Sequence, residues 1–439
     1  MAWPLILANS FWNIQLTVDR IFLGHHSTES LGAAMAVMGV FWVPMAFLQQ
    51  TAAYVVTFVA QYCGAKKLKM IGPSVWQSIY FSLTGGLLFL GFIPLAPPLF
   101  AFFGHSQAVQ PLEVAYFQAI CYSALPTAIV AALSGFYTGL GLSQMVMWIN
   151  GVGMVANVIL DYILIFGHLG APALGIAGAG YATAGANCAA MVFALFFVFS
   201  KKHQKVYAIR SSWHLNLALM AQFLRYGIPS GLQWALEGLA FTVFLIFIGN
   251  MPNGDAALVS SGIAVTILML AVLPALGIGQ ATSALVGQHL GENRPQVAEG
   301  SSWHGFQIAL IYIVSVSMTF LAFPEFYLSW FYNSADPRLW SQVATIVPYL
   351  LMFIAVFTSF DSINMVFSYA LKGAGDTRFV TTVALLVPWP TMVLPTWLVS
   401  HRADGVYWAW AGASSFIIIQ ALIYLWRFRQ GKWKSMRVI

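Results

Sequence analysis

Charged residues are scarce in this 439-residue chain: 19 Lys and Arg and 13 Asp and Glu make up only 7% of it. A water-soluble domain carries about 25% charged residues. The scarcity excludes an ordinary cytosolic enzyme, a disordered chain and a nucleic-acid binder. Hydrophobic residues make up 60% of the sequence. Their runs exceed the roughly 20 residues that a spanning helix needs and lack the alternation of an outer-membrane barrel. The sequence therefore predicts an all-α polytopic membrane protein.

Cysteine is also scarce. The three cysteines, Cys63, Cys121 and Cys188, are scattered and form neither a disulfide framework nor a metal-binding spacing. A secretory signal with a cleavage site is absent as well, because the apolar character that begins at Trp3 belongs to the first span. We expect no cofactor, and no metal beyond a possible Na⁺.

The apolar runs predict twelve transmembrane helices, several of them long enough to tilt or kink. Prolines inside these runs each remove a backbone donor and weaken the helix, among them Pro4, Pro126, Pro229, Pro274 and Pro348. The predicted spans are 3–24, 31–62, 74–102, 112–138, 146–167, 174–200, 217–249, 256–287, 303–331, 339–371, 379–400 and 405–426.

Basic residues are distributed unevenly between the loops. If the N-terminus is cytoplasmic, sixteen Lys and Arg, Lys372 among them, lie on the cytoplasmic side. Two, Arg338 and Arg402, lie outside, and Arg20 lies within the first span. Cytoplasmic loops carry an excess of Lys and Arg. This segregation predicts an even number of spans, with both termini on the cytoplasmic side of the plasma (inner) membrane.

The polar loop 201–210 divides the chain into halves with weak internal similarity. Pro4 and Gly24 are twenty residues apart, as are Pro229 and Gly249. Similar pairs follow in order: Gln61 and Gly64 with Gln288 and Gly291, and the Gly-x-Gly at 139–141 with that at 373–375. Six spans per half make a parallel repeat about an axis along the membrane normal. We predict two six-helix lobes, 1–205 and 206–439, related by a pseudo-two-fold axis around a central cleft. Such an arrangement is typical of transport by alternating access.

Four carboxylates lie well inside the apolar runs: Asp19, Asp161, Glu237 and Asp361. Placing them at helix centres costs roughly 10–14 kcal/mol in total if the terms add. Only Arg20 among the basic residues lies within a span. Most of these acids must therefore be protonated, bind a cation or face a water-filled cavity. The alternative is that they are neutral acids that hydrogen-bond to neighbouring helices.

Asn157 and Asp161 are four residues apart, so they share one face of the fifth span. An amide oxygen beside a carboxylate offers hard oxygen ligands to a small cation. Thr183 and Tyr116, on the sixth and fourth spans, could add hydroxyl groups.

At these residues the chain resembles the multidrug and toxic compound extrusion (MATE) transporter family, of the NorM-like bacterial type. The resemblance covers nearly the whole chain. It rests on short motifs whose order and spacing agree across both halves: ValAspArgIlePheLeuGly (18–24), AsnValIleLeuAsp (157–161), LeuGlyIleAlaGlyAlaGlyTyrAlaThr (174–183), ProSerGlyLeuGlnTrpAlaLeuGlu (229–237), AspSerIleAsn (361–364) and AlaLeuLysGlyAlaGlyAspThr (370–377).

The resemblance implies roles for particular residues. The family's N-lobe cation and proton site matches Asp19, Asn157, Asp161 and Thr183, with Tyr116 at a lining position. The acidic pair of Na⁺-coupled NorM-type members matches Glu237 and Asp361. Pro4 matches the proline at which the first helix bends. The implied protein is a monomeric antiporter that exports cationic or amphipathic drugs in exchange for Na⁺ or H⁺. Acids in both lobes leave the coupling ion open.

Three other functions are compatible with a polytopic chain. A flippase of the same superfamily, moving a lipid-linked or polysaccharide precursor, would need a cationic cavity for pyrophosphate, whereas the charges inside these spans are mainly acidic. A membrane-embedded enzyme would need a convergent His/Asp or Ser/His set, and the histidines within spans are too few. A channel does not require two repeats around a cleft.

Overall fold

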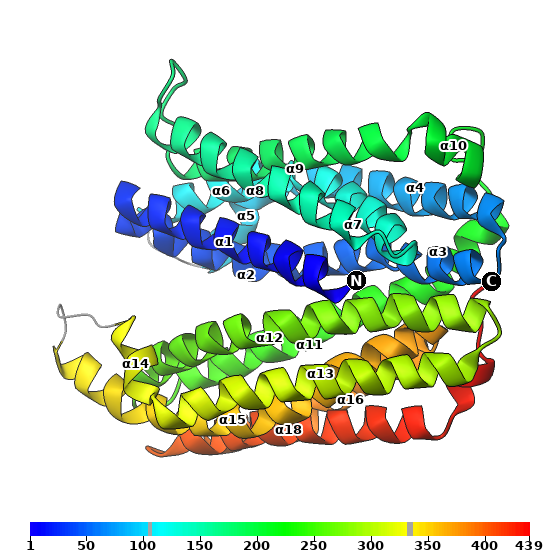
Figure 1. Cartoon of the computed structure of the whole chain (residues 1–439). Coiled ribbons are helices and arrows are strands. Elements are labelled where there is room, and N and C mark those ends of the chain that lie inside the picture. The colour runs from blue at the N-terminus through cyan, green and yellow to red at the C-terminus, as the bar shows by residue number, and fades with distance from the viewer. Residues whose placement is uncertain (104–107, 332–336) are drawn as a thin grey trace. The chain divides into compact units, whose positions relative to one another are not determined.

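The structure is a computed structural model that describes residues 1–103, 108–331 and 337–439. Helices account for nearly all of its regular structure, and they run lengthwise beside one another within each part of the molecule (Figure 1). In the described residues ten helices are long and apolar enough to cross a membrane, and a bent pair, α6 and α7, makes an eleventh. Helix α1 (Ala2–His26) is less apolar, but its 25 residues also suffice to span a bilayer. Together these elements account for the twelve predicted spans.

The helices fall at the predicted places along the chain. The first half consists of α2 (Thr28–Ala53), α3 (Val55–Gly64), α4 (Ile71–Leu90), α5 (Ala96–Phe103), α6 (Gln110–Cys121), α7 (Ala124–Gly139), α8 (Ser143–Phe166) and α9 (Ile176–Val198) after α1, followed by the short α10 (Lys201–Tyr207). The second half consists of α11 (Leu217–Gly249), α12 (Gly254–Gly291), α13 (Pro295–Ala322), α14 (Pro324–Ser329), α15 (Pro337–Ala374), α16 (Thr377–Leu386), the π-helical turn η3 (Trp389–Val393), α17 (Leu394–Val399) and α18 (Gly405–Arg429).

The predicted prolines have different local effects. Pro229, Pro274 and Pro348 lie inside the continuous helices α11, α12 and α15. Pro4 and Pro126 instead lie in the first turns of α1 and α7, where a missing backbone donor costs little. The chain bends by 41° between α6 and α7, just before Pro126.

Helix ends are the part of the prediction that was wrong. Helices α12 and α15 continue past the predicted ends of their spans, to Gly291 and Ala374, and α13 begins at Pro295, eight residues before the predicted start. Hydrophobicity stops at the membrane boundary, but the helical hydrogen bonds continue through the polar residues beyond it. Lys372, predicted to be a loop residue, therefore lies within α15, and its side chain is only 4% exposed.

The described chain forms two compact units. Unit 1 contains residues 1–234, 287–293 and 437–439, and unit 2 contains residues 235–286 and 294–436. The boundary in contacts thus falls within α11, and the lobes 1–205 and 206–439 remain a prediction. Unit 1 has an aromatic core in which Phe41 packs edge-on against Phe89 and Phe117. In the unit 2 core, Trp410 packs against Phe244 and donates its indole N–H to Ser261 Oγ over 3.0 Å.

One of the sequence repeats has a direct structural reason in unit 1. A Cβ atom added to Gly64 would overlap the carbonyl oxygen of Gln288, and one added to Gly291 would overlap the carbonyl oxygen of Gln61. The ends of α3 and α12 therefore meet backbone to backbone, which only glycine allows. Gln288 Nε2 also donates to the carbonyl oxygen of Gly139 over 2.8 Å.

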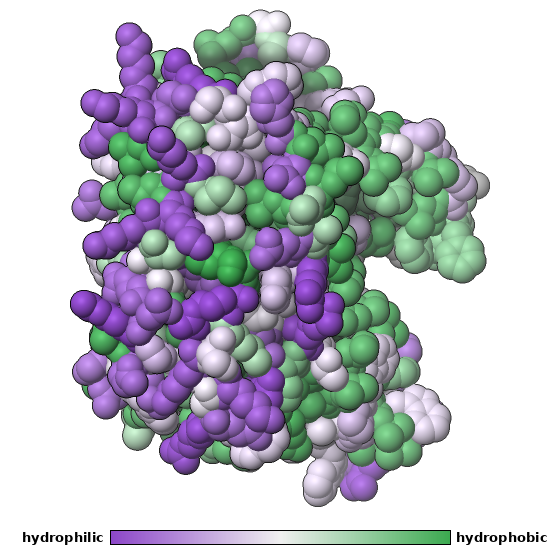
Figure 2. Space-filling view, turned by 90° about the vertical axis from the view of Figure 1, so that its right-hand side faces the viewer, coloured by the Kyte–Doolittle hydropathy of each residue, from purple (hydrophilic) through white to green (hydrophobic). Residues whose placement is uncertain are grey.

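The C-terminal residues dock beside this junction in unit 1. Val438 is 1% exposed, its N–H donates to Gln61 Oε1 over 2.8 Å, and its carbonyl oxygen accepts from Gln222 Nε2 over 2.6 Å. Figure 2 shows the end of the molecule that carries α10 and this C-terminal segment, and hydrophilic side chains gather over much of it. Polar side chains are thus abundant at this end of the molecule.

Candidate ion-binding sites

The first candidate site lies in unit 1, where α1 packs against α8 and α8 packs against α9. Asp19 is an acidic residue on the apolar helix α1, and it is buried, with only 7% of its surface exposed. Arg20, the next residue, has an exposed side chain that interacts electrostatically with Asp19. Successive residues on a helix point about 100° apart, and this rotation buries the acid while leaving its basic neighbour at the surface.

Asn157 and Asp161 lie one turn apart on α8, and both are fully buried. With its amide nitrogen turned toward the carboxyl groups, Asn157 donates to Asp19 Oδ1 and to Asp161 Oδ2, each over 3.0 Å. In the opposite orientation its oxygen would face only other acceptors, so the hydrogen-bond pattern determines the orientation. The structure thus brings Asp19, Asn157 and Asp161 together, but Asn157 faces the acids with its amide nitrogen and not with the oxygen that was expected as a cation ligand. We call Asp19 and Asp161 the unit 1 acid pair.

In the unit 1 acid pair the two carboxyl groups lie close to each other, and one of their oxygens lacks a hydrogen-bond donor in the described structure. The two carboxyl groups are within hydrogen-bond reach of each other, which requires a shared proton or a bound cation to relieve their repulsion. Within the part of the chain that the structure describes, Asp161 Oδ1 is buried and has no hydrogen-bond donor. A buried carboxylate oxygen without a donor is costly, so the site suits a proton or a small hard cation.

The other residues predicted for this site lie at different distances from the acids. Tyr116, on α6, is 3% exposed and interacts electrostatically with both Asp19 and Asp161. Thr183, on α9, is half-buried, and its backbone carbonyl accepts from Asn187 Nδ2 over 2.9 Å. A ligand role for Thr183 and bending of α1 at Pro4 remain predictions.

The second candidate site lies in unit 2, where four polar side chains follow one another across three helices. Gln420 Nε2, on α18, donates to Glu237 Oε1, on α11, over 2.9 Å. Gln420 Oε1 accepts from Asn364 Nδ2, on α15, over 3.2 Å, and the same nitrogen donates to Asp361 Oδ1 over 3.1 Å. We call Glu237 and Asp361 the unit 2 acid pair. Its members interact electrostatically and are joined by two amides.

A buried lysine accompanies the unit 2 acid pair. Lys372 Nζ lies 4.0 Å from the centroid of the Tyr369 ring, and the two residues, about one turn apart on α15, form a cation–π contact. The ammonium group also interacts electrostatically with Glu237. Unit 2 therefore supplies a cation of its own to its acids.

Sequence reasoning missed Gln420, Tyr424 and Lys372. Gln420 and Tyr424 are fully buried, and they are the two polar residues of the apolar run PheIleIleIleGlnAlaLeuIleTyrLeu (416–425) at i, i+4 spacing. That pattern could have indicated a buried polar contact. Lys372 was counted with the loop cations, because hydrophobicity alone ends its span too early.

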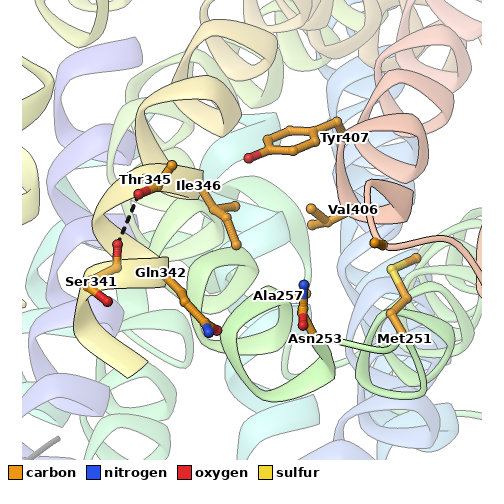
Figure 3. A pocket seen from close by; sticks show the side chains of 10 residues that line it. Met251, Asn253, Ala257, Ser341, Gln342, Thr345, Ile346, Val406 and Tyr407 are labelled. Atoms are coloured by element: carbon orange, nitrogen blue, oxygen red, sulfur yellow. Dashed lines mark hydrogen bonds between the residues drawn. The ribbon is translucent and has the colours of Figure 1, made fainter. Parts of the chain in front are cut away.

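A further cavity in unit 2, of about 410 Å³, contains none of the four acids. Figure 3 shows residues of α15, including Thr345 and Ile346, on one side of it, and Val406 and Tyr407 of α18 on the other. Among the described residues, no group of three or more His, Cys, Asp and Glu side chains could hold a metal ion, and all three cysteines are free.

Comparisons with known proteins agree with this architecture. The MatE family model matches residues 4–163 and 229–397, more than half of the chain. A Shewanella oneidensis protein named "Probable multidrug resistance protein NorM" is 26% identical and covers 98% of this chain and 93% of its own. A Thermotoga maritima protein of the same name is 25% identical, covering 100% and 93%. The solved outward-facing structure of a multidrug resistance MATE family transporter superposes with a TM-score of 0.90 at 21% identity, covering 99% of this chain and 96% of its own.

Proposed function

Because the chain belongs to the MatE family, we propose that it is a multidrug efflux antiporter, exporting cationic or amphipathic organic compounds in exchange for Na⁺ or H⁺. The names of the full-length relatives, multidrug resistance protein NorM, support this function. The protein is a transporter rather than an enzyme, and it needs no cofactor besides the coupling ion.

The observation that carries the proposal is the unit 1 acid pair with its shared asparagine. Two buried carboxyl groups in mutual contact, one of them with an oxygen that lacks a donor, form a site that changes charge when a proton or Na⁺ arrives. Asn157 keeps the two acids from α1 and α8 together, and Tyr116 closes the site from α6. Thr183 on α9 adds a hydroxyl group as the packing around the ion changes.

Antiport follows if ion and drug favour different conformations of the protein. In the outward-facing state the acids bind H⁺ or Na⁺ and become neutral, and the loss of negative charge favours release of a cationic drug. After return to the inward-facing state the ion leaves and cytosolic drug binds again. Coupling requires that each ligand has a differential affinity for the two states. Bending of α1 at Pro4 is the movement that we propose for the switch.

The unit 2 acid pair forms a second ion site in this proposal. Glu237 and Asp361 are bridged by amides and accompanied by Lys372, so their charge is already partly balanced. The unit 1 acid pair has no such buried lysine among the side chains that interact with it in the described structure. We therefore assign the dominant coupling site to unit 1 and a supporting one to unit 2.

The distribution of basic residues supports the placement in the membrane. We propose a monomer in the plasma (inner) membrane with both termini cytoplasmic, because sixteen of the nineteen Lys and Arg belong to that side. Its two lobes, 1–205 and 206–439, are related by a pseudo-two-fold axis and open alternately around a central cleft.

The proposal is tested by drug efflux from proteoliposomes of the purified protein. Ethidium efflux is measured first under a pure pH gradient and then under a pure Na⁺ gradient, with empty liposomes as the control. We expect efflux under one or both gradients, and the effective gradient identifies the coupling ion. Efflux that neither gradient drives would remove the antiport mechanism.

The flippase alternative is not favoured. A lipid-linked pyrophosphate is anionic, and its transport path would need buried basic groups. The four acids of the two pairs would instead repel it, and among the described residues Lys372 is the one buried lysine that could offset them.

A further inference from the structure

The amide bridge in unit 2 is a continuous path between two acids that lie on different helices. The path runs from Glu237 through Gln420 and Asn364 to Asp361, with heavy-atom distances of 2.9, 3.2 and 3.1 Å. Gln420 is fully buried, and Asn364 and Asp361 are 9% and 6% exposed. Buried amides require partners, so each link of the path depends on the next.

Every donor proton along this path is used, which fixes the direction of each amide. Asn364 Nδ2 donates its two protons to Asp361 Oδ1 and Gln420 Oε1. Gln420 Nε2 donates its two to Glu237 Oε1 and to the Tyr424 hydroxyl, 3.3 Å away. Tyr424 in turn donates to the carbonyl oxygen of Val380, on α16, over 3.0 Å. Turning either amide would set oxygen against oxygen, so the network has one arrangement while both acids are acceptors.

The network also connects the acid pair to the backbone. Helices α11, α15 and α18 each contribute side chains, and α16 contributes the Val380 carbonyl group. Among the described residues, Glu237 and Asp361 interact electrostatically with each other. Glu237 also interacts electrostatically with Lys372 and Tyr369 from α15 and with Tyr424 from α18. Helix α12 contributes the neutral Gln280, which is hydrogen-bonded to Tyr369. A change at either acid therefore reaches all four helices through Gln420.

We infer that Gln420 is a positioning residue that makes Glu237 and Asp361 respond to the coupling ion as one unit. This inference rests on the proposed antiport function and extends it to the bridge between the two acids. When an ion binds at one acid, that acid becomes a poorer acceptor, the amide of Gln420 shifts, and the shift is transmitted through Asn364 to the other acid. Without Gln420 the two acids remain coupled only through their direct electrostatic interaction.

The test measures coupling between the acids with and without the bridge. The purified protein carries Asp19→Asn and Asp161→Asn, so that only unit 2 responds, and its melting temperature is followed against NaCl at constant ionic strength and against pH. Four proteins are compared: the one with both acids intact, the Glu237→Gln variant, the Asp361→Asn variant and the variant with both substitutions. This cycle is measured once with Gln420 present and once with Gln420→Leu. This readout needs no transport, so its result is separate from the gradient experiment.

With Gln420 present, we expect Glu237→Gln to change the midpoint ion concentration of the remaining acid about fivefold, within the usual range of coupling between sites. With Gln420→Leu the change should fall to the smaller part that the direct electrostatic interaction of the two acids accounts for. Gln118→Leu is the matched control, because among the described residues Gln118 donates only to the Ile93 carbonyl oxygen, over 3.2 Å in unit 1, and this variant should leave the coupling unchanged. An equal change in the Gln420 and Gln420→Leu backgrounds, or no ion response at all, would overturn the inference.

A charge swap keeps the test decisive if Gln420→Leu does not fold. Gln420→Glu alone sets a carboxylate against Glu237 and should lower the melting temperature at pH 7. Combining it with Glu237→Gln restores one donor and one acceptor at this contact, so the swapped pair should regain both the melting temperature and the ion response. A swap that rescues neither property contradicts a positioning role for Gln420.

Discussion

The two acid pairs differ in the groups that surround their buried carboxyl groups. In unit 1 a single asparagine joins Asp19 to Asp161, and the acids touch. In unit 2 two amides separate Glu237 from Asp361, and Lys372 lies nearby. The unit 1 acid pair therefore depends on an ion or proton from outside, whereas the unit 2 acid pair has a buried lysine beside it that interacts with Glu237. The contrast predicts that the first pair drives exchange and the second adjusts it.

The largest expected effect is loss of exchange when the unit 1 acid pair is neutralised. Asp19→Asn and Asp161→Asn should each reduce ethidium efflux from proteoliposomes to the rate of empty liposomes, because an amide can neither take up a proton nor provide charge for Na⁺. Expression and melting temperature should be retained, since the substitutions preserve shape. Ion-driven efflux at the wild-type rate from either variant would contradict the assignment of the dominant coupling site to unit 1.

The second prediction compares the single and the double amide bridge. Asn157→Leu removes the donor from both acids at once and should lower the free energy of unfolding by about 1–3 kcal/mol. Asn364→Leu should cost less, because Gln420 still donates to Glu237. Asn150→Leu is the control on α8, since within the described part of the chain Asn150 Nδ2 donates only to the carbonyl oxygen of Val146, over 2.8 Å. Melting curves in detergent measure all three, and an Asn364→Leu loss as large as that of Asn157→Leu would contradict the comparison.

The third prediction concerns Lys372, the buried lysine beside the unit 2 acid pair. Lys372→Met removes the ammonium group, so the unit 2 acid pair should attract the coupling ion more strongly, with a half-maximal concentration lower by at least about fivefold, the lower end of the usual coupling between sites. The ion dependence of melting temperature in the Asp19→Asn/Asp161→Asn background measures this change. Lys434→Met removes a lysine that pairs with Glu299 at 2.7 Å and is about one-third exposed, and it should have no effect. An unchanged midpoint for Lys372→Met would mean that the lysine does not balance the acids.

The same contrast explains what could be predicted from the sequence. Asn157 and Asp161 lie on one helix at i, i+4 spacing, so their common face follows from helical geometry alone. The contact with Asp19 required a second helix, and the resemblance to a known family supplied it. The twelve spans followed from the apolar runs of the sequence, the first of them beginning at Trp3.

The bridge in unit 2 could not be predicted in the same way. Its links join α11, α15 and α18, and whether Gln420 faces Glu237 depends on how each helix is rotated about its axis. Nothing in the local sequence determines that rotation. Lys372 was misplaced for a different reason, because hydropathy reports where the membrane ends and not where the helix ends.

The smallest expected effect comes from an exposed acid, which provides the reference for the buried ones. Hydrogen bonds from Arg402, at 2.9 and 3.0 Å, and from Trp408 lower the pKa of Asp404 below its usual value. A lowered folded-state pKa contributes stability above the unfolded value, about 3.9, and this stability disappears as the pH falls through the folded value. Asp404→Asn should thus lower the melting temperature slightly at pH 7 and not at all near pH 2. Both partners are about half-exposed, so solvent screens the pair. If Asp404→Asn destabilised the protein as much as Asn157→Leu at pH 7, burial would not be what distinguishes the unit 1 acid pair from Asp404.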